Sequence, residues 1–106
     1  MALIRANSGS GGGGSSSTYS VVTGSAKSSS AGSYTFNYNG QAFVISHRAD
    51  YQVFSLTHNG TTTSIALKST SVINSYSDAF DVSSGDTMSI TSSTSNAYDY
   101  DIVLIQ

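Results

Sequence analysis

The side chains best suited to chemistry in this chain are two histidines, His47 and His58, in a sequence that also holds 24 serines and six aspartates. Serine, histidine and aspartate are the parts of a hydrolytic triad. The nucleophile elbow Gly-x-Ser-x-Gly is absent, and among so many serines a neighbouring Ser–His pair carries little information. Because His58 precedes an Asn-Gly turn and residues 47–50 read His-Arg-Ala-Asp, we expect both histidines in exposed loops and predict no enzyme.

Paired carboxylates are the second candidate chemistry. Asp99 and Asp101 alternate along the chain and would share one face of a strand. A glycosidase acid needs a dry, apolar setting, whereas both aspartates are flanked by tyrosine in a polar stretch. A calcium site is the alternative, because calcium takes oxygen ligands in flexible geometry. The candidate ligands would be Asp78, Asp81, Asp86, Asp99 and Asp101. The EF-hand pattern is absent, and we predict neither metal nor cofactor.

Aromatic side chains are the third candidate group, with seven Tyr, four Phe and no Trp. Exposed tyrosine rings can stack on sugar rings, and Tyr98 and Tyr100 are the candidates for glycan contact. Packing in a core or a subunit interface is the alternative, and we expect it for Tyr34, Phe36 and Tyr38.

The charge balance excludes several classes of partner. Four Lys and Arg against six Asp give a net charge of −2, without the basic patch of a nucleic-acid binder or a basic membrane-surface segment. The chain has no cysteine and therefore neither disulfide nor thiolate metal site. No apolar run is long enough for a membrane span, and the first residues lack the apolar region of a secretory signal. We therefore expect synthesis in the cytoplasm, with no membrane partner.

The first 17 residues differ in composition from the rest. Residues 1–7 contain the short apolar stretch Ala2-Leu3-Ile4 followed by Arg5. Residues 8–17 are only Ser and Gly, which predicts a flexible tether whose ends lie about 18 Å apart as a free coil. An engineered linker is the alternative. We predict a docking segment and tether over residues 1–17 and a single domain over residues 18–106.

Apolar residues recur with a period of two from Tyr19 onward, which predicts strands, and no stretch shows a helical period. The pairs Asn39-Gly40 and Asn59-Gly60 each lie between apolar runs and predict two-residue hairpin turns. The predicted strands cover residues 19–23, 34–38, 42–46, 51–57, 61–67, 72–73, 76–82, 87–91 and 98–105, with a turn at 83–86 and a loop at 92–97.

This arrangement predicts an all-β fold: an antiparallel β-sandwich, jelly-roll-like, with an extended N-terminal arm. The strand over residues 98–105 is apolar on both faces in its second half, as expected of a central strand or of one whose outer face meets another subunit. The chain is short and about half small and polar, so its core is marginal without further stabilisation. We therefore predict a homo-oligomer.

Three stretches carry a resemblance: residues 1–14, MALIRANSGSGGGG; residues 82–90, VSSGDTMSI; and residues 98–106, YDYDIVLIQ. The layout resembles small virion proteins of tailed bacteriophages, of the head decoration, head-fibre and tail-fibre type. Such proteins often join a short N-terminal anchor and a Gly-rich tether to a jelly-roll-like head. The resemblance implies a non-enzymatic structural component of the virion, assembled in the host cytoplasm, with capsid or tail proteins as partners.

In this interpretation the docking residues are Ala2, Leu3, Ile4 and Arg5, whose backbone would pair with a sheet edge of a capsid or tail protein. The alternative function is a glycan-binding module for host attachment, with Tyr98 and Tyr100 contacting sugar.

Overall fold

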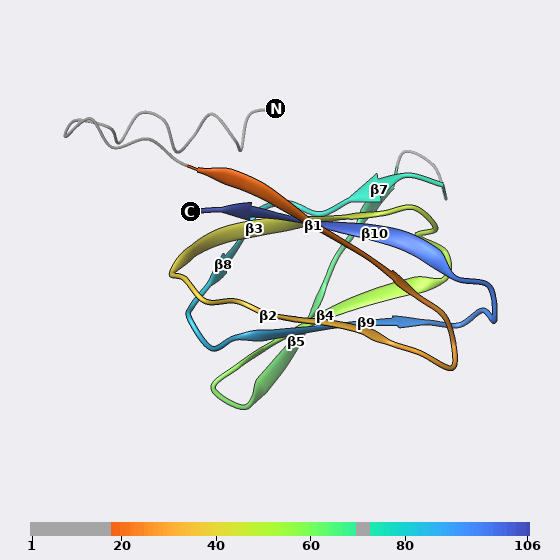
Figure 1. Cartoon of the computed structure of the whole chain (residues 1–106), viewed down its shortest axis with the longest axis horizontal. Helices are drawn as coiled ribbons and strands as arrows, with labels where there is room; N and C mark the ends of the chain where they lie inside the picture. The colour runs from red at the N-terminus through yellow and green to blue at the C-terminus, as the bar shows by residue number, and fades with distance from the viewer. Residues whose placement is uncertain (1–17, 70–72) are drawn as a thin grey trace.

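The structure is a computed structural model that describes residues 18–69 and 73–106. These residues form ten β-strands and no helix, in two antiparallel sheets that pack against each other (Figure 1). The expectation of an all-β fold is confirmed. No membrane-crossing helix occurs within the described ranges.

The strands divide between an upper and a lower layer in Figure 1. The first sheet has the order β1 (Tyr19–Ala26), β10 (Tyr98–Ile105), β3 (Gly40–Ser46), β7 (Ser75–Tyr76) and β6 (Lys68–Ser69), and β8 (Phe80–Val82) also pairs with β3. The second sheet has the order β2 (Gly32–Thr35), β9 (Thr87–Ser92), β4 (Gln52–His58) and β5 (Thr61–Ile65). The last strand is thus central in its sheet, as its apolar second half indicated.

The strand pairs are nested along the chain. The first strand pairs with the last, β2 with β9, β3 with β7 and β8, and β4 with β5. The chain therefore runs like one long hairpin wound across two layers. The first described residue, Thr18, meets the last, Gln106, through two backbone hydrogen bonds of 3.1 and 2.9 Å.

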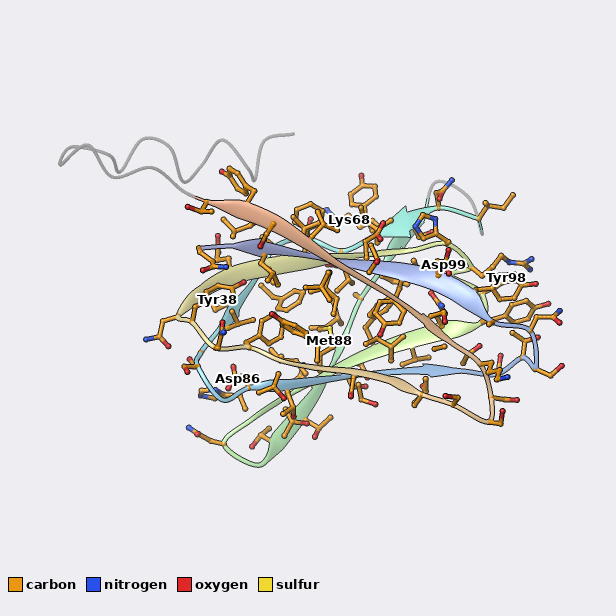
Figure 2. All side chains as sticks on the ribbon, in the orientation of Figure 1. Tyr38, Lys68, Asp86, Met88, Tyr98 and Asp99 are labelled. Atoms are coloured by element: carbon orange, nitrogen blue, oxygen red, sulfur yellow. The ribbon has the colours of Figure 1, made fainter. Side chains whose placement is uncertain are left out.

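The core lies between the two sheets and follows the period-two pattern. On β9, Met88 and Ile90 are buried while Thr87, Ser89 and Thr91 are exposed. Met88 lies between the layers near the middle of the molecule (Figure 2). The largest fully buried side chains are Phe36, Phe54, Met88, Ile90 and Ile102. Each such side chain contributes about 1.5–3 kcal/mol through removal from water, so these few residues account for much of the stability.

Two glycines make room for a buried tyrosine. A Cβ at Gly24 would lie 2.5 Å from the Tyr100 hydroxyl oxygen, and one at Gly32 would collide with the same atom. Burial raises the pKa of the Tyr100 phenol. The two glycines, on β1 and β2, thus allow the tyrosine to fill the space between the sheets, where its ring contacts Phe54 edge-to-face.

One of the two predicted hairpin turns is confirmed. Asn59 and Gly60 have φ angles of 49° and 80° and join β4 to β5, with His58 opposite Thr61. A two-residue turn with both φ angles positive matches the twist of the strands that it connects.

The hairpin predicted at Asn39-Gly40 is wrong. The strand before this pair, β2, lies in the second sheet, while β3 lies in the first, so the chain crosses between layers. Neither residue has positive φ, and Gly40 is already paired with Val82. The Asn39 side chain instead accepts a hydrogen bond of 2.9 Å from the Ser84 backbone N–H. The pattern was misleading because the packing of Phe36 in the core, not the turn, decides where this segment lies.

The strand predicted over residues 76–82 is interrupted. Opposite Val44, the buried Ser77 hydroxyl accepts a hydrogen bond of 3.0 Å from the Val44 N–H. The Ser77 hydroxyl thus replaces the backbone carbonyl that would otherwise accept this hydrogen bond. The regular pairing with β3 is interrupted there, which separates β7 from β8. Of the strand predicted over residues 72–73, Val72 lies outside the described residues and Ile73 is in a bend.

Candidate functional site

An aromatic cluster with an arginine lies where β3 leads into β4 and β10 begins. The rings of Tyr51 and Tyr98 are stacked, 5.8 Å apart at an interplanar angle of 22°. The Arg48 guanidinium carbon lies 4.6 Å from the first ring centroid and 5.0 Å from the second. Asp50 accepts two hydrogen bonds from this guanidinium, of 3.1 and 3.0 Å, which lower the pKa of its carboxyl. We name these four residues the arginine–tyrosine cluster.

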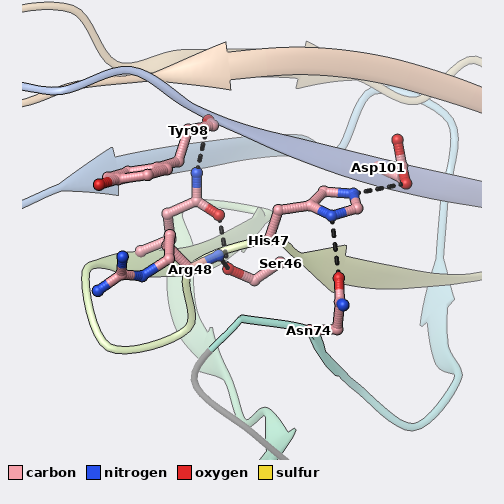
Figure 3. A network of polar contacts seen from close by, with 7 residues as sticks. Ser46, His47, Arg48, Asn74, Tyr98 and Asp101 are labelled. Atoms are coloured by element: carbon pink, nitrogen blue, oxygen red, sulfur yellow. Dashed lines mark hydrogen bonds and ion pairs between the residues drawn. The ribbon is translucent and has the colours of Figure 1, made fainter.

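Buried polar side chains hold the backbone beneath this cluster. The Ser46 hydroxyl donates to the Gln52 side-chain oxygen at 2.6 Å, and the Gln52 amide donates to the Tyr98 carbonyl at 2.8 Å (Figure 3). The Arg48 backbone N–H donates to the same hydroxyl at 3.2 Å. Both Ser46 and Gln52 are at least 97% buried, so breaking this chain would leave polar groups unsatisfied in the core. The cluster is therefore rigidly tied to the starts of β4 and β10.

The two histidines join loops rather than face a serine. His47 contacts Asn74 through Nδ1 and Asp101 through Nε2, each at 3.1 Å (Figure 3). His58 contacts Asp86 through Nδ1 at 2.7 Å and the Asn59 amide through Nε2 at 3.2 Å. Both ring nitrogens of each histidine thus contact aspartate or asparagine side chains.

A shallow polar groove of about 390 Å³ lies on the outer side of the first sheet. Its lining comes from β1, β10 and the residue after β3: Thr23, Gly24, Ser25, His47, Asp99 and Asp101. Asp99 points away from the layers at the same end of the molecule as Tyr98 (Figure 2). The groove thus offers two carboxylates and two hydroxyls, the acceptor and donor types that polar, hydroxyl-bearing ligands need.

The aspartates considered as calcium ligands are dispersed. Asp78 pairs with Lys68 at 2.9 Å, while Asp86 lies at the opposite end of the molecule from Asp99 (Figure 2). Across residues 18–69 and 73–106, no three side chains of metal-binding type come together. The structure therefore does not assemble the calcium site that the sequence left open.

The two candidate sugar-binding tyrosines differ in their exposure to solvent. Tyr98 is half-buried in the arginine–tyrosine cluster and keeps part of its surface accessible. Tyr100 is 5% exposed and packs beneath Gly24 and Gly32, so the expectation of an exposed Tyr100 ring is wrong. Alternation along β10 cannot reveal this difference, because both rings point to the same face. Arg48 and Tyr51 were missed, since their meeting with Tyr98 depends on packing between distant segments.

The outer face of the first sheet carries a second apolar cluster. Phe43, Val103 and Ile105 are buried there, with Ile45 and Ala79 packed against them. Val103 lies between Phe43 and the exposed Val21 across neighbouring strands. This cluster explains the apolar second half of β10 on both faces and extends to the edge strand β1.

The four predicted docking residues, Ala2, Leu3, Ile4 and Arg5, lie outside the described residues. No protein-family model matches this chain, and no curated protein matches it.

Proposed function

We propose that this protein is a non-enzymatic structural component of a virion, either a capsid decoration protein or a fibre protein. In this proposal the β domain is displayed on the particle as a homo-oligomer after assembly in the host cytoplasm. The proposal needs no cofactor, metal, nucleic acid or membrane, in keeping with the low charge of the chain.

The observation that carries the proposal is the nested order of the strand pairs. We propose that the fold is a jelly roll, in which eight principal strands wind across two sheets as this order describes. Jelly rolls are common among viral capsid and lectin domains. The strand order therefore agrees with a particle-bound or a sugar-binding protein.

The composition of the first 17 residues supports the attachment mode. A short apolar segment containing Ala2, Leu3, Ile4 and Arg5 would add as a strand to a sheet edge of a capsid or tail protein. The Ser/Gly stretch over residues 8–17 would then hold the β domain away from the attachment point.

Deleting residues 1–17 is expected to leave a folded domain that no longer joins particles. Thr18 and β1 remain, so the pairing of Thr18 with Gln106 and of β1 with β10 is kept. Circular dichroism would report the fold, and quantitative gel analysis of purified particles would report occupancy. Replacing Leu3 and Ile4 by Asp in the full chain is a second test of the docking segment, and this variant should also fail to join particles. Normal occupancy of either variant would contradict the proposed anchor.

Glycan binding is the second candidate function, and the arginine–tyrosine cluster favours it. A partly accessible Tyr98, a guanidinium and the Asp50 carboxylate that it binds combine an apolar surface with hydrogen-bonding groups. Sugar sites need both, because a pyranose has an apolar face rimmed by hydroxyls.

Replacing Tyr98 by alanine is expected to weaken retention on a glycan array about tenfold if this surface binds sugar, through loss of ring contact. Tyr76→Ala, on β7 of the first sheet, is the control and should leave retention unchanged. The absence of retention of the unaltered chain on every glycan would remove this candidate function.

A further inference from the structure

The first strand forms one edge of its sheet. Among the described residues, β1 pairs with β10 on one side and with no strand on the other. Thr18 and Gln106 exchange two backbone hydrogen bonds, which makes them a hydrogen-bonded pair. Since such pairs alternate in an antiparallel ladder, the N–H and C=O groups of Val21, Thr23 and Ser25 point away from β10. The edge therefore presents a regular row of donors and acceptors.

Within residues 18–69 and 73–106, this edge has none of the usual protection against pairing. Natural edge strands carry lysine, proline, a bulge or very short length. At eight residues, β1 is longer than the other edge strands β2, β5 and β6, and residues 19–26 contain neither charge nor proline. Its side chains add apolar surface, because Val21 is 58% and Tyr19 40% exposed, on the side of the sheet that carries Val103 and Ile105.

We propose that β1 pairs antiparallel with β1 of a second copy of this chain, joining the two first sheets into one continuous sheet about a two-fold axis. The proposal rests on the homo-oligomeric part of the proposed function, for which it names the surface. Thr18 continues the ladder of β1 through its pairing with Gln106, and over residues 18–26 the register with the greatest overlap places Val22 opposite Val22 of the second copy. Val21 then lies opposite Thr23 of the second copy, and Tyr19 opposite its Ser25.

A second copy fits this edge for two reasons. The strand is neutral over its whole length, so two copies meet without like charges directly opposite each other. The register also brings Tyr19 next to Ser25 of the other copy, which lines the polar groove with Asp99 and Asp101. A phenol is a hydrogen-bond donor and a carboxylate an acceptor, so the exposed ring of each copy meets a complementary surface on the other.

Replacing Val21 by lysine in the full chain is the first test. We expect the unaltered chain to sediment as a dimer or a multiple of it, and Val21→Lys to weaken self-association about tenfold or more, because it removes apolar contact and places charge at the edge. Val53→Lys is the matched control, since Val53 is a similarly exposed valine on the second sheet, and its association should be unchanged. Circular dichroism would confirm that both variants are folded.

Cysteine cross-linking tests the register in a chain that has no cysteine of its own. In the proposed dimer, the double variant Val21→Cys/Thr23→Cys should give a covalent dimer on mild oxidation, because opposed residues in a hydrogen-bonded pair lie about 5.5 Å apart at Cα. Each single variant places its cysteine diagonally from its own copy, about 7–8 Å away, and should cross-link poorly.

A monomer at all concentrations would overturn the proposal, as would an oligomer that Val53→Lys disrupts and Val21→Lys does not. Unchanged association of Val21→Lys without cross-linking of the double variant would also overturn it. These results are independent of particle incorporation, because the deletion of residues 1–17 leaves β1 in place. Loss of the anchor and loss of self-association are therefore distinguishable.

Discussion

Replacement of Phe54 by alanine is expected to lower the free energy of unfolding by about 3–5 kcal/mol. Phe54 lies on β4 in the centre of the second sheet, is 0% exposed, and contacts the Tyr100 ring edge-to-face at a centroid distance of 6.0 Å. Alanine would remove these contacts and leave a cavity that the paired strands on either side cannot close. The total free energy of unfolding of a domain of this size is roughly 5–15 kcal/mol, so the loss is a large part of its stability.

The neighbouring residue is the control for this prediction. Val53, one position earlier on the same strand, is 51% exposed, and Val53→Ala should change stability by less than about 0.5 kcal/mol. Urea unfolding followed by far-UV circular dichroism would measure both variants. If Phe54→Ala fails to fold, Phe54→Leu can be measured in its place. Leucine keeps most of the buried volume, so its loss in free energy of unfolding should lie between those expected for Val53→Ala and Phe54→Ala. Equal effects of Phe54→Ala and Val53→Ala would show that the inward face of β4 is wrongly assigned.

Replacement of Asp86 by alanine is expected to lower the free energy of unfolding by about 2–3 kcal/mol, because it removes two hydrogen bonds of a buried carboxylate. This loss is second only to the one expected for Phe54→Ala. Asp86 is 5% exposed, accepts from the Ser83 backbone N–H at 2.9 Å, and contacts His58 Nδ1 at 2.7 Å. Its carboxylate thereby ties the turn before β9 to the β4–β5 hairpin. Asp81→Ala, at an exposed position on β8, is the control and should cost less than about 0.5 kcal/mol.

The same carboxylate makes stability depend on pH. Burial by itself would raise the pKa of Asp86, but the hydrogen bonds from Ser83 and His58 together outweigh burial and lower this pKa below its ordinary value. Because the pKa is lower in the folded state, the stabilisation is complete above the unfolded pKa, about 3.9, and is lost as the pH falls through the folded value. In the unaltered chain, the urea concentration at the unfolding midpoint should therefore decrease as the pH is lowered below about 4. A parallel fall in Asp86→Asn would contradict this assignment.

Local patterns in the sequence were sufficient for much of the fold. Alternation along β9 and β10 predicted their faces, because side chains on a strand point alternately to its two sides. The hairpin at Asn59-Gly60 was predicted because Asn and Gly readily adopt the two positive φ angles that this turn needs. The absence of helical period predicted the absence of helices from the described residues in the same way.

The candidate site was predicted only in part. Tyr98 was identified from its residue type, but Arg48 and Tyr51 join it only because the end of β3 lies beside the starts of β4 and β10. Tyr100 shares a face with Tyr98 yet is buried, since Gly24 and Gly32 allow the two layers to close over it. These contacts join residues that lie far apart in the sequence, so they cannot be inferred from any short stretch of it.

What the sequence by itself determined were the features that depend on neighbouring residues: strands, their two faces and one tight turn. Only the tertiary structure decided which sheet each strand joins. Asn39-Gly40 and Asn59-Gly60 are the same dipeptide between similar apolar runs, yet one crosses between layers and the other closes a hairpin. The physical reason is that burial of Phe36 and the pairing of β2 with β9, more than 50 residues apart, outweigh the preference of a two-residue turn.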